Sequence, residues 1–158
     1  MSGDGVDQPP ATAGELGERE AMIEAWLADA KRDNPVVAAV DRDPTERRWF
    51  VRLRGEEKDI TTVWFTLGQR TLRYETYVMP APEENHAALW EFFLRRNDKL
   101  NGMAFSIGEE DAVFLRGQLG VHALGRPDLD RILGSLYVTV ERFFRPAMRI
   151  GYASRFRN

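Results

Sequence analysis

The sequence contains no cysteine and only two histidines. Without thiols, the chain forms no disulfide bond, offers no cysteine ligand to a metal and carries no thiolate nucleophile. Neither His86 nor His122 has an acidic or nucleophilic partner that the sequence places beside it. We therefore interpret His86 as a packed or capping residue and His122 as a structural or solvated loop residue, and we expect neither a metal site nor a cofactor.

A surplus of basic residues and long apolar runs are also missing. The formal net charge is -3, whereas proteins that bind nucleic acid in general are usually basic. No apolar run approaches the roughly 18 to 20 residues of a membrane span. The first residues lack the basic and apolar segments of a secretory signal. These absences predict a cytoplasmic protein without membrane association and disfavour nucleic acid as its partner.

The motifs of common catalytic and nucleotide-binding sites are absent from the sequence. Gly117, Gly120 and Gly125 do not reproduce a G-x-G-x-x-G or P-loop pattern. The acidic turn at residues 109–111 lacks the length and glycine pattern of an EF-hand loop. No serine lies in a G-x-S-x-G elbow. We therefore predict that the protein is not an enzyme.

The composition that is present is that of an ordinary globular domain. Of 158 residues, 43% are hydrophobic and 30% are charged, which is enough apolar material for one core. Residues 1–14 are rich in Gly, Asp, Pro and Ala and contain little to bury. The sequence predicts a disordered tail over residues 1–14 and a single α+β domain over residues 15–158.

Hydrophobic periodicity predicts the secondary structure of this domain. Helical spacing begins at Glu15 and ends before Pro35. A long helix starts at Pro127, and we expect Pro146 to kink or end this helix. We expect strands over 36–40, 49–54, 60–67, 70–79, 103–107 and 112–119, with a helix from 83 to about 101. The order is α-β-β-β-β-α-β-β-α. Hairpins of this kind favour an antiparallel sheet with helices packed on one side.

Alternation along the strands separates two faces of the predicted sheet. The core face collects Trp49, Val51, Leu53, Val63, Phe65, Leu67, Leu72, Tyr74, Val78, Met103, Phe105, Ile107, Val113 and Leu115. The opposite face combines aromatic residues with arginines, namely Phe50, Arg52, Trp64, Arg73, Tyr77, Phe114 and Arg116. Aromatic residues and arginine are enriched at protein interfaces, so we interpret these seven residues as a partner-binding face. Alternatively, the C-terminal helix, the N-terminal tail or a dimer mate shields them.

A pair of arginines near the end of the second helix forms another candidate. Guanidinium groups bind phosphate and carboxylate, so Arg95 and Arg96 are candidate contacts for an anion or a partner. Cations at a helix C-terminus also stabilise the helix through its dipole, and we favour this second interpretation.

Several segments together resemble the actinobacterial branch of the YbjN family, described as bacterial sensory transduction regulators. The resemblance spans roughly residues 20–155 and rests on residues 77–85, 94–97, 99–107, 112–117, 128–134 and 150–154. It implies a fold like that of type III secretion chaperones, a two-layer α+β domain that is frequently dimeric. It brings no catalytic residues. The connection from Gly120 to Arg126 is less acidic than the resemblance leads us to expect.

The functional hypothesis that follows is a non-enzymatic module, chaperone-like or regulatory, that acts as a homodimer. It would bind a peptide or protein segment by its sheet face or by an exposed strand edge. An alternative is single-strand nucleic-acid binding, in which the aromatic residues stack on bases and the arginines contact phosphates. A further alternative is the sensing of a small ligand in a pocket between helix and sheet.

Overall fold

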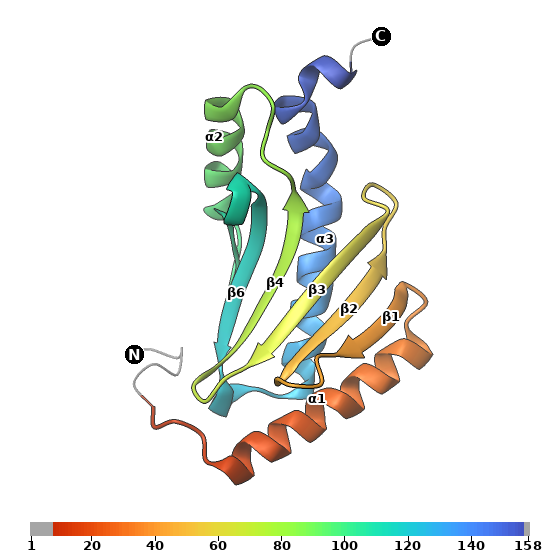
Figure 1. Ribbon diagram of the computed structural model, residues 1–158, viewed down its shortest axis with the longest axis vertical. Coiled ribbons are helices and arrows are strands. Elements are labelled where there is room, and N and C mark those ends of the chain that lie inside the picture. The colour runs from red at the N-terminus through yellow and green to blue at the C-terminus, as the bar shows by residue number, and fades with distance from the viewer. Residues whose placement is uncertain (1–7, 157–158) are drawn as a thin grey trace.

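The computed structural model describes residues 8–156, which form one antiparallel sheet with helices on one side (Figure 1). The helices are α1 (Ala13–Asp33), α2 (His86–Asn97) and α3 (Arg126–Gly151). The strands are β1 (Val37–Arg42), β2 (Arg48–Arg54), β3 (Ile60–Leu67), β4 (Thr71–Met79), β5 (Ala104–Ile107) and β6 (Val113–Gly120). Short 3₁₀ turns occupy Glu109–Asp111, Val121–Ala123 and Ala153–Phe156.

The strand order in the sheet is β1-β2-β3-β4-β6-β5, so β5 and β1 are the edges. In Figure 1, α3 passes behind the strands, α2 lies at the upper end of the sheet near β6 and α1 runs along the lower end of the sheet. The opposite face of the sheet, turned to the reader, has no helix of residues 8–156 over it. The prediction of an α+β domain, with helices against one face of an antiparallel sheet, is confirmed.

The core fills the space between the sheet and the three helices of the described chain. Trp26 of α1 meets Phe65 of β3 edge to face, with ring centroids 5.7 Å apart, and both side chains are fully buried. The predicted core face is buried along every strand with one exception. Ile107 is 52% exposed, because it ends the edge strand β5 and an edge strand has a neighbouring strand on one side only.

Proline at position 146 does not end α3. The helix continues to Gly151, and Ala147 and Gly151 are both buried. The backbone N–H groups of Glu83 and Glu84 donate to the Gly151 carbonyl over 2.9 and 3.1 Å. Tertiary packing and this external cap hold the last turn of α3 in place, and they outweigh the hydrogen bond that proline cannot donate.

The start of α2 lies three residues after the predicted one. Glu83 and Glu84 are held by α3, and Asn85 has a left-handed backbone with φ of 56° before the helix begins at His86. Asparagine tolerates this conformation better than most residues. Two of the segments that carry the family resemblance therefore contact each other, since Glu84 also accepts hydrogen bonds from the backbone and hydroxyl of Ser154.

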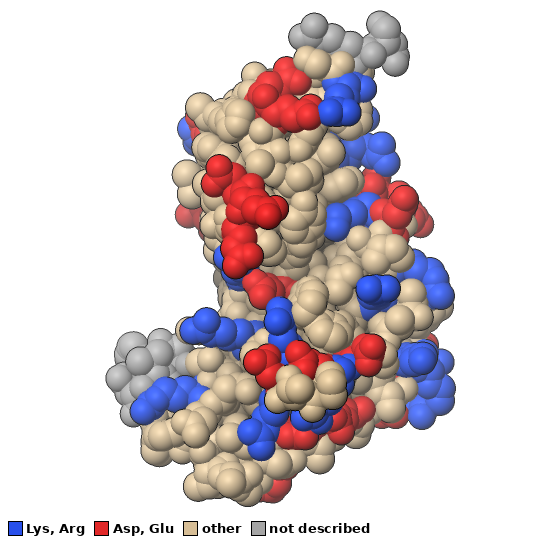
Figure 2. All heavy atoms as spheres, viewed as in Figure 1, with Lys and Arg blue, Asp and Glu red and all other residues tan. Residues whose placement is uncertain are grey.

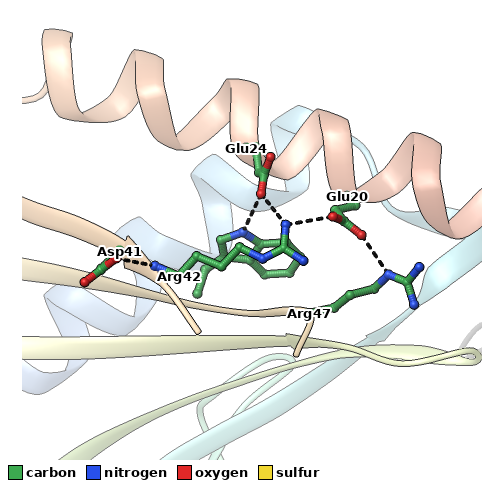
Figure 3. A network of polar contacts seen from close by, with 6 residues as sticks. Glu20, Glu24, Asp41, Arg42 and Arg47 are labelled. Carbon is green, nitrogen blue, oxygen red and sulfur yellow. Dashed lines mark hydrogen bonds and ion pairs between the residues drawn. The ribbon is translucent and has the colours of Figure 1, made fainter. Parts of the chain in front are cut away.

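Polar contacts fasten α1 to the first two strands (Figure 3). The Glu20 carboxylate accepts from Arg42 and Arg47, in both cases over 2.7 Å. Glu24 accepts a further hydrogen bond from Arg42. The Arg42 guanidinium also lies 5.2 Å from the centroid of the Trp49 ring. These groups fix the orientation of α1 across β1 and β2.

The predicted tail over residues 1–14 lies partly within the described residues. Residues 1–7 lie outside them. The N–H of Ala11 donates to the carbonyl of Gln69 over 2.8 Å, and the His122 ring lies 2.8 Å from the carbonyl oxygen of Pro9. Thr12 and Glu15 form a capping box at the start of α1, which satisfies the free N–H groups of the first turn.

Candidate functional site

The candidate site is the uncovered face of the sheet, which we call the open face. Antiparallel register aligns its side chains in rows that cross the strands. One row contains Arg48, Thr66, Arg73 and Gln118 on β2, β3, β4 and β6. The next contains Phe50, Trp64, Glu75 and Arg116 on the same strands. Two further aromatic residues, Tyr77 and Phe114, are paired across β4 and β6.

Aromatic side chains on the open face pack against each other in pairs. Phe50 and Trp64 meet edge to face with centroids 4.1 Å apart. Tyr77 and Phe114 meet in the same way at 5.6 Å. Tyr77 remains 39% exposed, so its pair with Phe114 still reaches the surface. Pairs of this geometry add roughly 0.5 to 1.5 kcal/mol beyond their area.

Cationic side chains lie against these rings. The Arg48 guanidinium is 4.1 Å from the centroid of Trp64, and that of Arg116 is 4.2 Å from the centroid of Phe114. The Lys58 ammonium lies 5.5 Å from the Tyr77 centroid and donates to the Tyr77 carbonyl over 3.2 Å. Each contact orients a cation on the sheet before any partner arrives. Burial lowers the pKa of the Lys58 ammonium and raises the pKa of the Tyr77 hydroxyl.

One acidic side chain lies in the middle of the open face. Glu75 accepts a hydrogen bond from Arg116 over 2.7 Å, while its other oxygen is 3.9 Å from Arg48. Figure 2 shows basic and acidic side chains interspersed on this side of the molecule, with uncharged surface between them. The open face therefore carries ordered charges rather than a uniform field.

Side chains occupy polar groups on both edges of the sheet. On β5, the Asn97 amide donates to the Phe105 carbonyl over 3.1 Å, and its oxygen accepts from the Phe105 N–H over 2.7 Å. On β1, the Asp41 carboxylate accepts from the N–H of Arg42 over 2.7 Å (Figure 3). Side chains that occupy edge groups discourage pairing with another strand. One residue on each edge therefore already has its backbone groups partly or fully occupied by a side chain of this chain.

The structure brings together all seven residues predicted for the partner-binding face. They lie on β2, β3, β4 and β6, and their side chains share the open face: Phe50, Arg52, Trp64, Arg73, Tyr77, Phe114 and Arg116. Two further residues of the open face, Arg48 and Gln118, were not predicted. Arg48 lies one residue before the predicted strand over 49–54, whereas Gln118 lies within the predicted strand over 112–119 but was not assigned to this face. In the sequence, Arg48 precedes Phe50 by two residues, so the alternation along the strand puts both side chains on the same face. This pattern would have identified Arg48.

The arginine pair of α2 lies apart from this face. Arg95 pairs with Glu91 one turn earlier over 2.8 Å. Arg96 lies over the rings of Phe92 and Phe143, at 4.0 and 5.7 Å from their centroids. The two guanidinium groups therefore have different local partners. Their contact with an anion or partner stays a prediction.

An apolar patch lies beside β5, on the α2 side. Leu94 is 68% exposed, and Ile107 is 52% exposed. Together with Trp90, Phe93, Phe105, Ser106 and Val113 they surround a hollow of about 220 Å³. Exposed apolar groups gathered in this way are typical of protein contact sites. We call this surface the α2–β5 patch.

A cleft of about 550 Å³ opens between α1 and α3. Trp26, Leu53 and Leu133 form apolar walls, and Asp29 pairs with Arg126 across the rim over 2.6 Å. Gly134 of α3 also lines the cleft, and a side chain there would meet nothing within 4 Å. This cleft lies between helices and the sheet, the position at which a small-ligand pocket is predicted.

Residues 8–156 contain no cluster of three or more metal-binding side chains. In the same part of the chain, no helix is both long and apolar enough to cross a membrane.

Comparison of the fold with solved structures defines the class of protein. The fold matches a chain of the ExsC–ExsE complex with a TM-score of 0.54 and 20% identity, covering 80% of this chain and 93% of that one. It also matches a chain of the heterodimeric ExoU–SpcU complex from the type III secretion system of Pseudomonas aeruginosa, with a TM-score of 0.53 and 13% identity over 80% and 97% of the two chains. The Yersinia pestis type III secretion chaperone SycH, solved with a fragment of YscM2, gives 0.51 and 14% over 77% and 96%. The domain has the fold of type III secretion chaperones.

The sequence then places the chain within a family. Residues 20–147 match the model of the YbjN family, described as "Putative bacterial sensory transduction regulator", and the chain belongs to this family. An uncharacterized protein of Mycobacterium tuberculosis is 31% identical over 105 residues, covering 66% of this chain and 57% of that protein. An uncharacterized protein of Mycobacterium leprae is 27% identical over 107 residues, covering 68% and 58%. This chain thus spans a little over half the length of the curated relatives that it matches.

Proposed function

We propose that this protein is a non-enzymatic, cytoplasmic binding module, chaperone-like or regulatory, that holds a segment of a partner protein on its open face. The main observation in support of this proposal is the pairing of aromatic and cationic side chains on one face of the sheet. No helix of residues 8–156 covers that face. Rigid aromatic residues and arginine are the residue types that contribute most to protein interfaces. The structural neighbours solved in complexes support a protein as the partner.

The same contacts disfavour the nucleic-acid alternative. Base stacking needs a free ring face, and guanidinium groups already lie over the rings of Trp64 and Phe114. The cleft beside Gly134 supports the small-ligand alternative. A Gly134→Leu variant would fill that cleft, so a compound that raises the melting temperature of the wild type but not of the variant would support this alternative.

The test of the proposed function is a selection of binding peptides from a displayed peptide library against the wild-type protein. Selected peptides should lose at least tenfold in affinity for Trp64→Ala and Tyr77→Ala, which truncate one aromatic residue of each pair. Val138→Ala is the matched control, because Val138 is 61% exposed on α3, away from the open face. Equal affinity for all four proteins would exclude the open face as the binding site.

We further propose that two copies associate through the α2–β5 patch. Leu94 and Ile107 are the large apolar side chains exposed there, and a symmetric dimer buries such a patch against its own copy. Light scattering should give twice the monomer mass for the wild type and the monomer mass for Leu94→Glu and Ile107→Glu. Val138→Glu should remain dimeric. A wild-type protein that is monomeric at high concentration would contradict this proposal without affecting the open face.

A further inference from the structure

Two rows of the open face border one hollow. It has a volume of about 680 Å³ and is lined by Glu46, Arg48, Thr66, Arg73, Tyr74, Glu75, Arg116, Gly117 and Gln118. Its three arginines come from three strands, β2, β4 and β6. Because adjacent strands are about 4.8 Å apart, Arg48 and Arg73 start roughly 10 Å apart on either side of β3. Their side chains thus approach the hollow from two sides.

The guanidinium groups in this hollow have donors to spare. The Nε atom of Arg48 is buried and has no hydrogen-bond partner within residues 8–156, and the nearest carboxylate oxygen, from Glu75, is 3.9 Å from its Nη2 atom. Arg73 is exposed and makes no hydrogen bond or ion pair with any described residue. Buried donors without partners are rare and costly. Arg48 and Arg73 therefore have free capacity for an acceptor.

The local charge favours an anion. Three arginines line the hollow against two glutamates, and Glu75 is already paired with Arg116 over 2.7 Å. The chain as a whole carries a net charge of -3, so this positive charge is a local property of the open face. A planar guanidinium matches the two oxygens of a carboxylate with two parallel hydrogen bonds.

We propose that the open face recognises an acidic segment of its partner, with an aspartate or glutamate carboxylate bound between Arg48 and Arg73. This inference rests on the proposed function and names the chemistry of the partner. The contact between Arg48 and Trp64 holds the Arg48 guanidinium in place. The neighbouring ring edges of Phe50 and Trp64 contact the apolar residues of the partner on either side of the carboxylate. Complementary charge of this kind determines which partner binds.

The experiment measures fluorescence anisotropy with two labelled synthetic peptides. One alternates aspartate with leucine and phenylalanine, and the other has asparagine at every aspartate position. The wild type should bind the acidic peptide at least tenfold more tightly than the asparagine peptide. Arg73→Gln and Arg48→Gln should each lose about tenfold in affinity for the acidic peptide, the equivalent of one charge-assisted contact.

Matched controls separate the effect of the planar guanidinium group from the effect of its charge. Arg95→Gln removes an exposed arginine on α2, which pairs with Glu91, and should leave the affinity unchanged. Arg73→Lys keeps the charge without the planar fork, so it should recover only part of the loss. Arg73 has no partner to lose within the described residues, so this site remains a valid test even if Arg48→Gln perturbs the fold.

Three results would overturn the inference. Equal affinity for both peptides would show that no carboxylate is recognised, although the open face could still bind protein. Failure of the acidic peptide to bind would exclude the proposed chemistry, while the library selection with Trp64→Ala and Tyr77→Ala decides the proposed function separately. Tighter binding of a single-stranded thymidine oligonucleotide, lost in Arg73→Gln, would assign the arginines to phosphate instead.

Discussion

The carboxylate of Glu141, on α3, accepts the backbone N–H of Lys58 in the turn between β2 and β3 over 3.1 Å. The same carboxylate accepts the N–H groups of Glu56 and Glu57, over 2.6 and 3.2 Å. The hairpin tip is therefore fixed to a helix that is 83 to 85 residues away in the sequence. It is also fixed beside the open face, because Lys58 reaches Tyr77 from this turn.

Removal of the Glu141 carboxylate should loosen this turn. We expect Glu141→Ala to lower the free energy of unfolding by about 1 to 3 kcal/mol, since three N–H groups lose a charged acceptor. Hydrogen exchange at residues 56–58 should accelerate. Glu141→Gln, which keeps one acceptor oxygen, should lose less, and Glu91→Gln on α2 is the control. Unchanged exchange at residues 56–58 in Glu141→Ala would contradict this assignment.

Asn97 should protect the β5 edge from pairing with another chain. We expect Asn97→Leu to lower the free energy of unfolding by about 1 to 3 kcal/mol, because the Phe105 N–H and carbonyl both lose their partner. The freed edge should also promote aggregation, which thioflavin fluorescence on mild heating measures. Asn101→Leu, in the exposed loop that follows α2, is the control. An Asn97→Leu protein as stable and as soluble as the wild type would contradict the prediction.

Substitution by alanine should change the free energy of unfolding in opposite directions at two glycines. A methyl group at Gly117 would lie 2.1 Å from the Gly102 carbonyl oxygen and 2.5 Å from the Tyr74 ring, where the Tyr74 hydroxyl donates to that same carbonyl over 2.6 Å. Gly117→Ala should therefore cost about 1 to 3 kcal/mol or prevent folding. A methyl group at Gly17, on the exposed side of α1, meets nothing within 4 Å, so Gly17→Ala should gain about 1 kcal/mol. Chemical denaturation measures both changes, and a destabilising Gly17→Ala would refute the comparison.

Glu20 should make the stability of the folded protein depend on pH. Hydrogen bonds from Arg42, then from Arg47, lower the pKa of this carboxyl below its ordinary value of 4.5. A carboxyl whose pKa is depressed by folding stabilises the protein fully above the unfolded value, and this contribution is lost as pH falls towards the folded pKa. The difference in melting temperature between the wild type and Glu20→Gln should therefore be largest near neutral pH and shrink below about pH 4. A difference that grows on acidification would contradict this sign.

The order of elements and the two sheet faces could be predicted because they depend on local periodicity. Alternation along β2, β3, β4 and β6 assigned Phe50, Trp64, Tyr77 and Phe114 to one face, and the structure places them there. Pro146 and the start of α2 could not be predicted, because contacts with distant residues decide them. The carbonyl of Gly151 receives the N–H groups of Glu83 and Glu84, a relationship that no local pattern contains.

By itself, the sequence determined the fold class and seven residues of the open face, because side-chain period and turn chemistry are local properties of the chain. Its resemblance to the YbjN family rested on particular segments of sequence. Only the tertiary structure decided how those residues lie together. The strand register set Arg48 and Arg73 on either side of β3, and the helices covered the other face of the sheet. Strand register and layer packing depend on every strand at once. The free donors in the hollow that the three arginines line could therefore be identified only from the folded chain.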